Sequence, residues 1–316
     1  MSNADGLIPG DLKPISEYTI AGWKSPADRE RLSRFECERL EAGKILFFEK
    51  APFAFPEEDQ KYLLGVRQTG STLHKNIAYR PAADKITGLE KGSADAENLH
   101  RILRNFSQNV VAFATEFLNA YQQKWKLDYA SFRPLQEKGR PLRTSARNDL
   151  LHVDNFPTRP TNGDRIARVF ININPTESRR WITGDPIDIL APQYAEKKAI
   201  EKAVREAKSP LRGVKSAVKS LARPLGVVNR SPYDQFMIDF HHYLKHNETY
   251  QKECRKDYWE FPPGSVWIVY TDSVPHAVLS GQYMLEQTFL ISKDAMVTPD
   301  RMPIRVLEKM AGAALG

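Results

Sequence analysis

Residues 265–291, SVWIVYTDSVPHAVLSGQYMLEQTFLI, read as a strand, a turn, His276, a second turn and another strand. In SVWIVY, side chains of different character alternate between two faces, as they do in a β-strand. Similar short segments recur from about residue 128, separated by Pro, Gly and Asn turns: SFRPL, LLHVDNF and RIARVFININ. Several short strands behind a helical front half predict an α+β chain whose core is an antiparallel sandwich or barrel.

The front half of the chain shows helical periodicity. Residues 26–43 read as a charged amphipathic helix closed by Gly43, and KILFFEK at 44–50 reads as a short strand. In 96–125, the clearest helix, apolar residues recur at spacings of three and four: Leu99, Leu103, Phe106, Val110, Phe113, Phe117 and Tyr121. We expect a single domain over 1–316, with mainly helical support at 1–127, a β-rich core at 128–297 carrying a helical insertion at about 192–250, and a C-terminal helix at 298–316.

Composition limits the class of protein. Of the 316 residues 41% are apolar, the formal net charge is +7 and the pI is near 9.2. No stretch approaches the ~20 apolar residues that span a bilayer, and the N-terminal segment lacks a signal-peptide pattern. The two cysteines, Cys37 and Cys254, lie far apart, which suits a reducing compartment. We expect a soluble cytoplasmic protein whose positive charge favours anionic partners.

The segment LLHVDNFPTRP at 150–160 places His152 and Asp154 two residues apart in a probable strand. Residues i and i+2 of a strand share a face, so these two side chains converge on one point. The same spacing occurs at His246 and Glu248, but in a helix-prone stretch where such side chains diverge. A half-buried histidine bonded to its neighbouring aspartate explains the first pair equally well, so the pair alone decides nothing.

His276 supplies a third element. It follows a strand and lies far beyond the pair in sequence, which fits the two-histidine, one-carboxylate triad of non-haem iron oxygenases. We therefore predict that His152, Asp154 and His276 bind Fe(II). Such a site leaves adjacent positions open for a bidentate 2-oxo acid and O2.

A 2-oxo acid also needs a cation for its far carboxylate, preferably an arginine. Many such oxygenases place the cation shortly after the distal histidine, but residues 286–290 read EQTFL and hold none. In RIARVFININ, Arg168 lies on a polar face backed by a β-branched one, as expected of a strand that lines a cavity. Arg168 is the first candidate for binding 2-oxoglutarate, Arg133 is the second, and Gln287 completes the set.

The insertion contains an unusually basic stretch at about 192–223. Within SPLRGVKSAVKSLARP, one helical stripe is apolar and another is basic, with Lys208 a turn earlier: Arg212, Lys215 and Lys219. A helix of this kind either packs on the protein through its apolar side or lies in an anionic lipid interface.

Several segments resemble those of the Kdo hydroxylase family: HVDNFPTRPTNGDRIARVFININP, RRW at 179–181, SPYDQFMIDFHHYLK and FPPGSVWIVYTDSVPHAVLSGQYMLEQTF. The resemblance runs from EAGKILFF near residue 41 to the C-terminal PIRVLEKMAG, and 192–223 matches less well. It implies a double-stranded β-helix (jelly roll, cupin-like) core, with His152, Asp154 and His276 as iron ligands and Arg168 as the 2-oxoglutarate anchor.

The resemblance also implies a reaction. Members are Fe(II)- and 2-oxoglutarate-dependent dioxygenases that hydroxylate C3 of Kdo, the acidic sugar next to lipid A in lipopolysaccharide, to give Ko; ascorbate can assist. Candidate ligands of the sugar carboxylate flank the metal motif, Arg143, Arg147 and Arg159, with Lys75 and Asn76 weaker; each is equally explained as a solvated loop residue. With such a substrate, the basic insertion becomes a candidate for peripheral docking on the cytoplasmic face of the inner membrane. A homo-oligomer is left open.

Other classes of protein stay open. His242 and His246 stand at i and i+4 on a helix and so could chelate zinc, but the glutamate of an HEXXH hydrolase is missing. A cupin-like module that binds metal or sugar without oxygen chemistry is a second alternative. A nucleic-acid binder is disfavoured, because no basic strip interleaved with aromatic residues is present.

Overall fold

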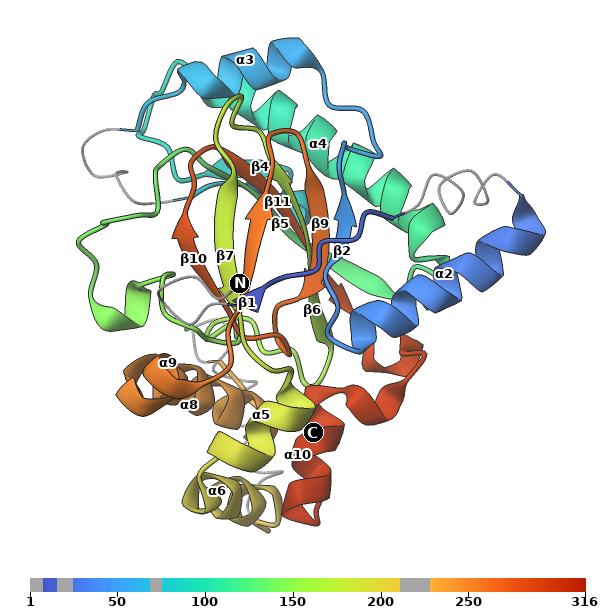
Figure 1. Cartoon of the computed structure of the whole chain (residues 1–316), viewed down its shortest axis with the longest axis vertical. Coiled ribbons are helices and arrows are strands. Elements are labelled where there is room, and N and C mark those ends of the chain that lie inside the picture. Colours follow the sequence, from blue (N-terminus) through green and yellow to red (C-terminus); the bar gives the residue numbers. More distant parts are fainter. Residues whose placement is uncertain (1–7, 16–24, 69–75, 211–227) are drawn as a thin grey trace.

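The computed structural model describes residues 8–15, 25–68, 76–210 and 228–316. Two β-sheets pack face to face at its centre, and helices cover one sheet and one end of the pair (Figure 1). The predicted combination of helices and antiparallel strands is confirmed. None of the helices in these ranges is both long and apolar enough to cross a membrane.

The larger sheet has seven strands in the order β2–β9–β6–β11–β5–β3–β4, and every pairing is antiparallel. The strands are Leu46–Phe48 (β2), Val266–Tyr270 (β9), Arg165–Asn172 (β6), Met284–Ile291 (β11), Trp125–Arg133 (β5), Ile77–Arg80 (β3) and Lys85–Thr87 (β4). On β6 the predicted two faces are present: Val169 and Ile171 pack under the helices, whereas Phe170 faces the other sheet.

The smaller sheet has the order β1–β8–β7–β10: Ile8–Pro9 (β1), Asp257–Phe261 (β8), Arg179–Thr183 (β7) and His276–Ser280 (β10). Beyond β10, an isolated antiparallel bridge joins His276 to His152. Large apolar side chains from both sheets fill the space between them: Phe170, Trp181, Phe261, Trp267, Val278 and Met284.

The described residues of the N-terminal part include the helices Pro26–Glu41 (α2), Glu57–Gly65 (α3) and Ala96–Phe117 (α4). The predicted stripe of α4 is buried against the larger sheet except for the half-buried Phe113. The helix ends at Phe117, earlier than expected, and a 3-10 turn at Asn119–Tyr121 follows it. Gln122 and Gln123 then adopt positive φ values of 50° and 54° and turn the chain into β5. The N-terminal part also supplies β2, which lies within the strand expected at 44–50, and the further strands β3 and β4.

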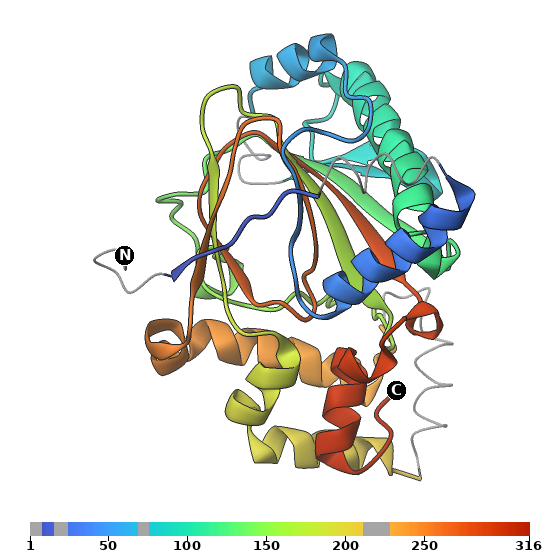
Figure 2. The ribbon, with the colours of Figure 1, turned by 45° about the vertical axis from the view of Figure 1, so that its right-hand side comes forward.

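The remaining helices gather at one end of the sheets (Figures 1 and 2). They are Ile187–Tyr194 (α5), Lys197–Ala207 (α6), Pro232–His246 (α8), Glu248–Glu253 (α9) and Pro303–Ala311 (α10). Leu151 and Val153 join their apolar core. The basic stripe predicted over Arg212, Lys215 and Lys219 lies outside the described residues.

Candidate metal centre

The strand-like segment around residue 152 is held in register with β10 by paired backbone hydrogen bonds. The His152 N–H donates to the His276 carbonyl at 3.2 Å, and the reverse bond measures 3.0 Å. The Asp154 N–H donates to the Thr271 carbonyl at 2.7 Å. Because Leu151 and Val153 are packed among the helices, alternation turns His152 and Asp154 to the opposite face.

The three predicted metal ligands converge. One ligand atom from each of His152, Asp154 and His276 can be chosen so that all lie within 4.8 Å of one another. The Nε2 atom of His152 lies 3.7 Å from Asp154 Oδ1, and Nε2 of His276 lies 3.9 Å from Asp154 Oδ2. Among the described residues, no other cluster of three or more His, Cys, Asp or Glu could hold a metal ion.

Backbone carbonyls set the tautomer of both imidazoles. His152 Nδ1 lies 2.7 Å from the Leu150 carbonyl, and His276 Nδ1 lies 3.0 Å from the Val274 carbonyl. Since a carbonyl only accepts, each Nδ1 carries the proton and each Nε2 presents a lone pair to the centre. Burial lowers the pKa of both imidazoles and so favours the neutral form that binds metals.

Asp154 is kept ionised by its surroundings. Burial alone would raise its pKa, but Arg168 and the two imidazoles hold the pKa well below the usual range. Arg168 Nη2 lies 2.9 Å from Asp154 Oδ2. Two neutral imidazoles and one carboxylate therefore face a common point, and these donors suit a divalent transition metal.

A cavity of about 50 Å³ adjoins the triad between the two sheets. Glu286 lies at its wall, at the position where the sequence analysis looked for a cation. It accepts hydrogen bonds from Arg133 at 3.0 Å to both oxygens, and Arg168 lies 3.1 Å away on the other side. Both predicted arginine candidates therefore line the cavity, but carboxylates already pair with them.

Arg179, at the start of β7, is a cavity residue that the sequence analysis did not identify. It is 1% exposed, and none of its guanidinium nitrogens has a hydrogen-bond partner. The nearest carboxylate, Glu137, lies 3.7 Å from Nη2. Burial lowers the pKa of Arg179 to about 10, and Arg133 adds to the effect. The strand-like sequence RRWIT could have indicated this residue, because strand alternation places Arg179 on the same face as Trp181.

Trp181 lies beside the triad. Its ring stacks on the His276 ring with centroids 5.4 Å apart and planes at 22°. It lines the same cavity, and its buried Nε1 has no hydrogen-bond partner. Arg179 and Trp181 thus leave several buried N–H donors for a ligand with acceptor oxygens.

Gln287 does not reach the cavity. Glu286 faces inward, so its neighbour on β11 faces the helices. There the Gln287 side chain accepts from Ser107 Oγ at 2.6 Å and donates to the Asp128 and Thr288 carbonyls. Both the oxygen and the nitrogen of its side-chain amide therefore already have hydrogen-bond partners in the fold.

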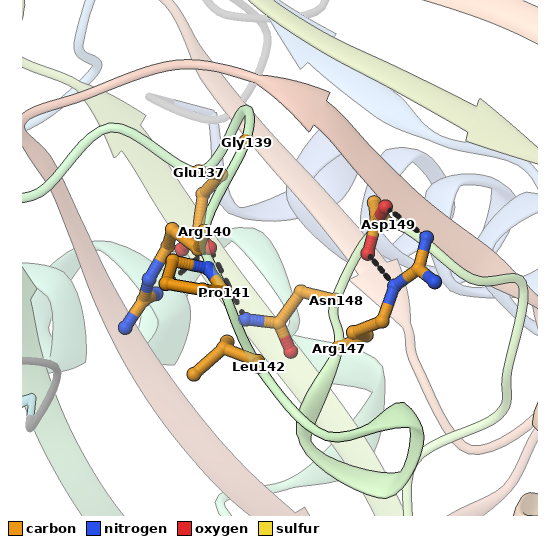
Figure 3. A pocket seen from close by; sticks show the side chains of 8 residues that line it. All are labelled: Glu137, Gly139, Arg140, Pro141, Leu142, Arg147, Asn148 and Asp149. Carbon is orange, nitrogen blue, oxygen red and sulfur yellow. Dashed lines mark hydrogen bonds and ion pairs between the residues drawn. The ribbon is translucent and has the colours of Figure 1, made fainter.

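A second cavity, of about 250 Å³, adjoins the first, because Asn148 lines both. Figure 3 shows the side chains that line the second cavity. Arg140 and Asn148 point toward Glu137, at 2.9 and 3.4 Å from Oε2 (Figure 3). Arg147 also lines this cavity and forms two hydrogen bonds with Asp149, at 2.9 and 2.6 Å.

The other predicted substrate ligands lie apart. Arg143 is exposed in the loop that carries Arg147. Arg159 bonds Asp128 at 2.9 Å, and its guanidinium lies over the rings of Tyr129 and Phe156. Asn76 is exposed at the start of a described segment, and Lys75 lies outside the described residues. His242 and His246 are both exposed on α8.

Comparisons with known proteins agree with this geometry. The family model described as 3-deoxy-D-manno-oct-2-ulosonic acid (Kdo) hydroxylase matches residues 23–314. The chain is similar to a crystal structure of the Kdo hydroxylase KdoO, a non-haem Fe(II) α-ketoglutarate-dependent dioxygenase, in complex with α-ketoglutarate and Fe(III). The two chains are 32% identical with a TM-score of 0.73, and the match covers 90% of this chain and 92% of that one. The apo KdoO structure matches at 33% identity with a TM-score of 0.74, again over 90% and 92% of the two chains. No curated protein sequence matches the chain.

Two imidazoles and one carboxylate beside a cavity between antiparallel sheets define the class of non-haem iron oxygenase sites. Within that class, the chain belongs to the Kdo hydroxylase family.

Proposed function

We propose that this protein hydroxylates C3 of Kdo to give Ko, in Kdo–lipid A of lipopolysaccharide, using Fe(II), 2-oxoglutarate and O2. The observation that carries the proposal is the convergence of His152, Asp154 and His276 with both Nε2 lone pairs turned inward. Family membership and the likeness to KdoO supply the substrate and the co-substrate.

We interpret the two sheets as a double-stranded β-helix. When the 148–154 segment is counted as one strand, eight strands run from β5 to β11. The first four alternate between the sheets, beginning with β5 in the larger sheet and ending with β7 in the smaller one. The last four alternate again, beginning with β8 in the smaller sheet and ending with β11 in the larger one. This is the path of two Greek keys in a jelly roll. It brings the second and seventh strands side by side, which places His152 next to His276.

Arg179 is the carboxylate anchor for 2-oxoglutarate in this proposal, because it lines the cavity beside the triad. Arg168 was the first choice from sequence, but Asp154 and Glu286 already pair with it, and Glu286 binds Arg133 through both oxygens. The guanidinium of Arg179 makes no hydrogen bond, its only ion-pair partner among the described residues is Glu137 at 3.7 Å, and it matches a carboxylate in charge and shape. Trp181 Nε1 offers one more donor to the same ligand.

The residues of the chain then have separate tasks. The bound iron and co-substrate supply the activation of O2, with succinate and CO2 as by-products. Arg168 orients and holds the Asp154 carboxylate, and the Leu150 and Val274 carbonyls orient the two imidazoles. Trp181 packs against His276, and the apolar residues between the sheets exclude bulk water.

The substrate is expected to approach from the loop side, where the second cavity adjoins the first through Asn148. Arg147 lines that cavity and Arg143 lies in the same loop, so both stay candidates for the anionic sugar. Arg159 is a weaker candidate, because Asp128 and two aromatic rings already hold its guanidinium.

We also propose peripheral contact with the anionic cytoplasmic face of the membrane. The support is the net charge of +7 and the basic residues of 208–219, among which Lys208 alone lies in the described ranges. Neutralising Lys208, Arg212, Lys215 and Lys219 together should weaken binding to vesicles containing anionic lipid at low salt. Unchanged binding would exclude this stretch as the docking element.

The function is tested by incubating Kdo–lipid A with protein, Fe(II), 2-oxoglutarate and air, and by measuring one added oxygen and the succinate released. His152→Ala and His276→Ala should abolish turnover. They should weaken iron binding by more than the roughly 10- to 100-fold that is typical of losing a residue that only supports a metal ligand. His246→Ala, on the exposed side of α8, is the matched control and should behave as the wild type. Iron binding without succinate release would favour a non-catalytic binding module.

A further inference from the structure

Lys245, near the end of α8, is a buried cation without an acidic partner. The residue is 5% exposed, and its Nζ donates one hydrogen bond, to the Ser145 carbonyl at 3.2 Å. No carboxylate among the described residues lies within ion-pair distance of this ammonium. Burial lowers the pKa of Lys245 to about 8, because Asp154 and Asp149 offset the loss of hydration only in part.

The position of Lys245 relative to the metal centre is specific. The Ser145 carbonyl that it bonds belongs to the 143–149 loop, and Asn148 of that loop lines the cavity at the triad. Asp154 raises the pKa of Lys245, but no ion pair joins the two side chains.

Helix α8 is held firmly in this place. His241, one turn before Lys245, donates from Nδ1 to the Val153 carbonyl at 2.7 Å, and its ring lies 5.0 Å from the His152 ring. In the sequence, Val153 stands between the two proposed ligands His152 and Asp154. The Lys245 side chain is therefore positioned by contacts that also support the triad.

The chemistry of the substrate requires an anion receptor at such a place. A 2-ulosonic acid carries its carboxylate on C2, and in the 3-deoxy sugar C3 is the neighbouring carbon. When C3 is presented to the metal, the carboxylate lies two bonds away from it. Its receptor must therefore stand near the metal without being a ligand.

Other cations near the metal fit this requirement less well. Arg147 is engaged by Asp149 through two hydrogen bonds, and Arg133 and Arg168 are engaged by Glu286. An isolated buried ammonium is costly for a fold, so a partner that arrives with the substrate explains why it is kept.

We propose that Lys245 binds the carboxylate of the Kdo residue and so positions C3 toward the metal. This inference rests on the proposed function. It makes Lys245 a specificity-determining residue, and the insertion helices become part of the substrate site.

The test is a comparison of Lys245→Met, Lys245→Gln and Lys245→Arg with the wild type. Loss of the charge should raise the apparent KM for Kdo–lipid A by roughly ten- to a hundredfold, the range for a hydrogen bond to a charged group. The KM for 2-oxoglutarate and the affinity for Fe(II) should stay within twofold, about the scatter of such measurements. Lys245→Arg should restore most of the binding, and exposed Lys252→Met on α9 is the matched control.

Binding measured without O2 separates the possible failures. Wild type should prefer Kdo–lipid A to its carboxyl-amidated derivative, and Lys245→Met should bind the two alike. If wild type binds and hydroxylates Kdo–lipid A but Lys245→Gln does so with an unchanged KM, the role of Lys245 is refuted and the function stands. If Arg147→Met raises the KM instead, the carboxylate belongs to Arg147. If wild type binds no Kdo–lipid A, both proposals fail.

Discussion

Glu286 shows how one side chain can reverse an expectation drawn from sequence. It stands where many related sites have a cation, but it accepts from Arg133 and pairs with Arg168. The positive charge is thus present at the same place and is carried by neighbouring strands. Since both arginines are already neutralised, the co-substrate is left with Arg179.

Arg179→Met should therefore raise the apparent KM for 2-oxoglutarate by roughly ten- to a hundredfold, because it removes a charge-assisted carboxylate contact. Arg168→Met should instead weaken Fe(II) binding, since Asp154 loses the partner that holds it. Steady-state kinetics and anaerobic iron titration measure the two effects.

Arg180→Met is the control for this pair. Arg180 is next to Arg179 on β7, but it lies on the exposed side and pairs with Glu260 at 3.1 Å. Its substitution should change neither quantity. A larger effect of Arg168→Met than of Arg179→Met on the 2-oxoglutarate KM would return the anchor to Arg168.

The metal ligands were predictable at the scale of residues, whereas the anchor was not. His152 and Asp154 share a face because a strand has a period of two, and this local rule needs no partner. Whether an arginine is free depends on the acids that approach it. Arg133 and Glu286 are 153 residues apart in sequence, so no local pattern reports their ion pair.

At the scale of elements, α8 joins the helical group to the metal centre. It begins with a capping box in which Ser231 Oγ accepts from the Asp234 N–H at 3.1 Å and Asp234 Oδ2 accepts from the Ser231 N–H at 3.2 Å. Asp234 Oδ1 also accepts from the backbone of Thr161 and Asn162, beyond the metal motif. The start of the helix is thereby tied to the segment that follows the ligands.

Ser231→Ala should lower the free energy of unfolding by about 1 kcal/mol, the usual cost of losing an N-cap side chain. Urea unfolding followed by circular dichroism measures this change. Thr249→Ala, at an exposed position of α9, is the control and should stay within about 0.5 kcal/mol of the wild type. Equal stability of the Ser231 variant and wild type would show that the cap does not contribute.

The elements themselves were largely predictable. The stripe of α4 and the two faces of β6 follow the expected periods. The helix expected at 96–125 is too long. Gln122 and Gln123 adopt positive φ angles in the turn before β5, and the helical spacing of apolar residues does not predict such a turn. The capping sequence SPYD was a readable signal for the start of α8.

At the scale of the whole molecule, buried arginines and carboxylates make stability depend on pH. Burial alone would raise the pKa of Glu137 and Glu286, but the surrounding guanidinium groups outweigh it and the pKa of each is lowered in the folded state. A carboxyl group with a lowered pKa stabilises the fold above its ordinary pKa, which is 4.5 for a glutamate, and this contribution is lost as the pH falls through the folded pKa.

We expect the free energy of unfolding of the metal-free protein to fall below pH 4.5, and to fall less steeply in Glu286→Gln. The variant should also be about 3–5 kcal/mol less stable at neutral pH, because Arg133 and Arg168 both lose the buried carboxylate that they share. Urea unfolding across this pH range tests both points, with exposed Glu116→Gln on α4 as control. An identical slope in wild type and Glu286→Gln would contradict the assignment.

The sequence by itself determined the strand alternation, the long amphipathic helix and the three candidate metal ligands, because the first two follow from the local period of the backbone and the candidates from ligand chemistry. Only the tertiary structure decided which cations keep an acidic partner. Arg168 and Arg133 pair with Glu286 across the sheet at 3.1 and 3.0 Å. Arg179 makes no hydrogen bond and has Glu137 only at 3.7 Å, and Lys245 has no acidic partner among the described residues. The physical reason is that burial and pairing are set by side chains brought together from distant parts of the chain.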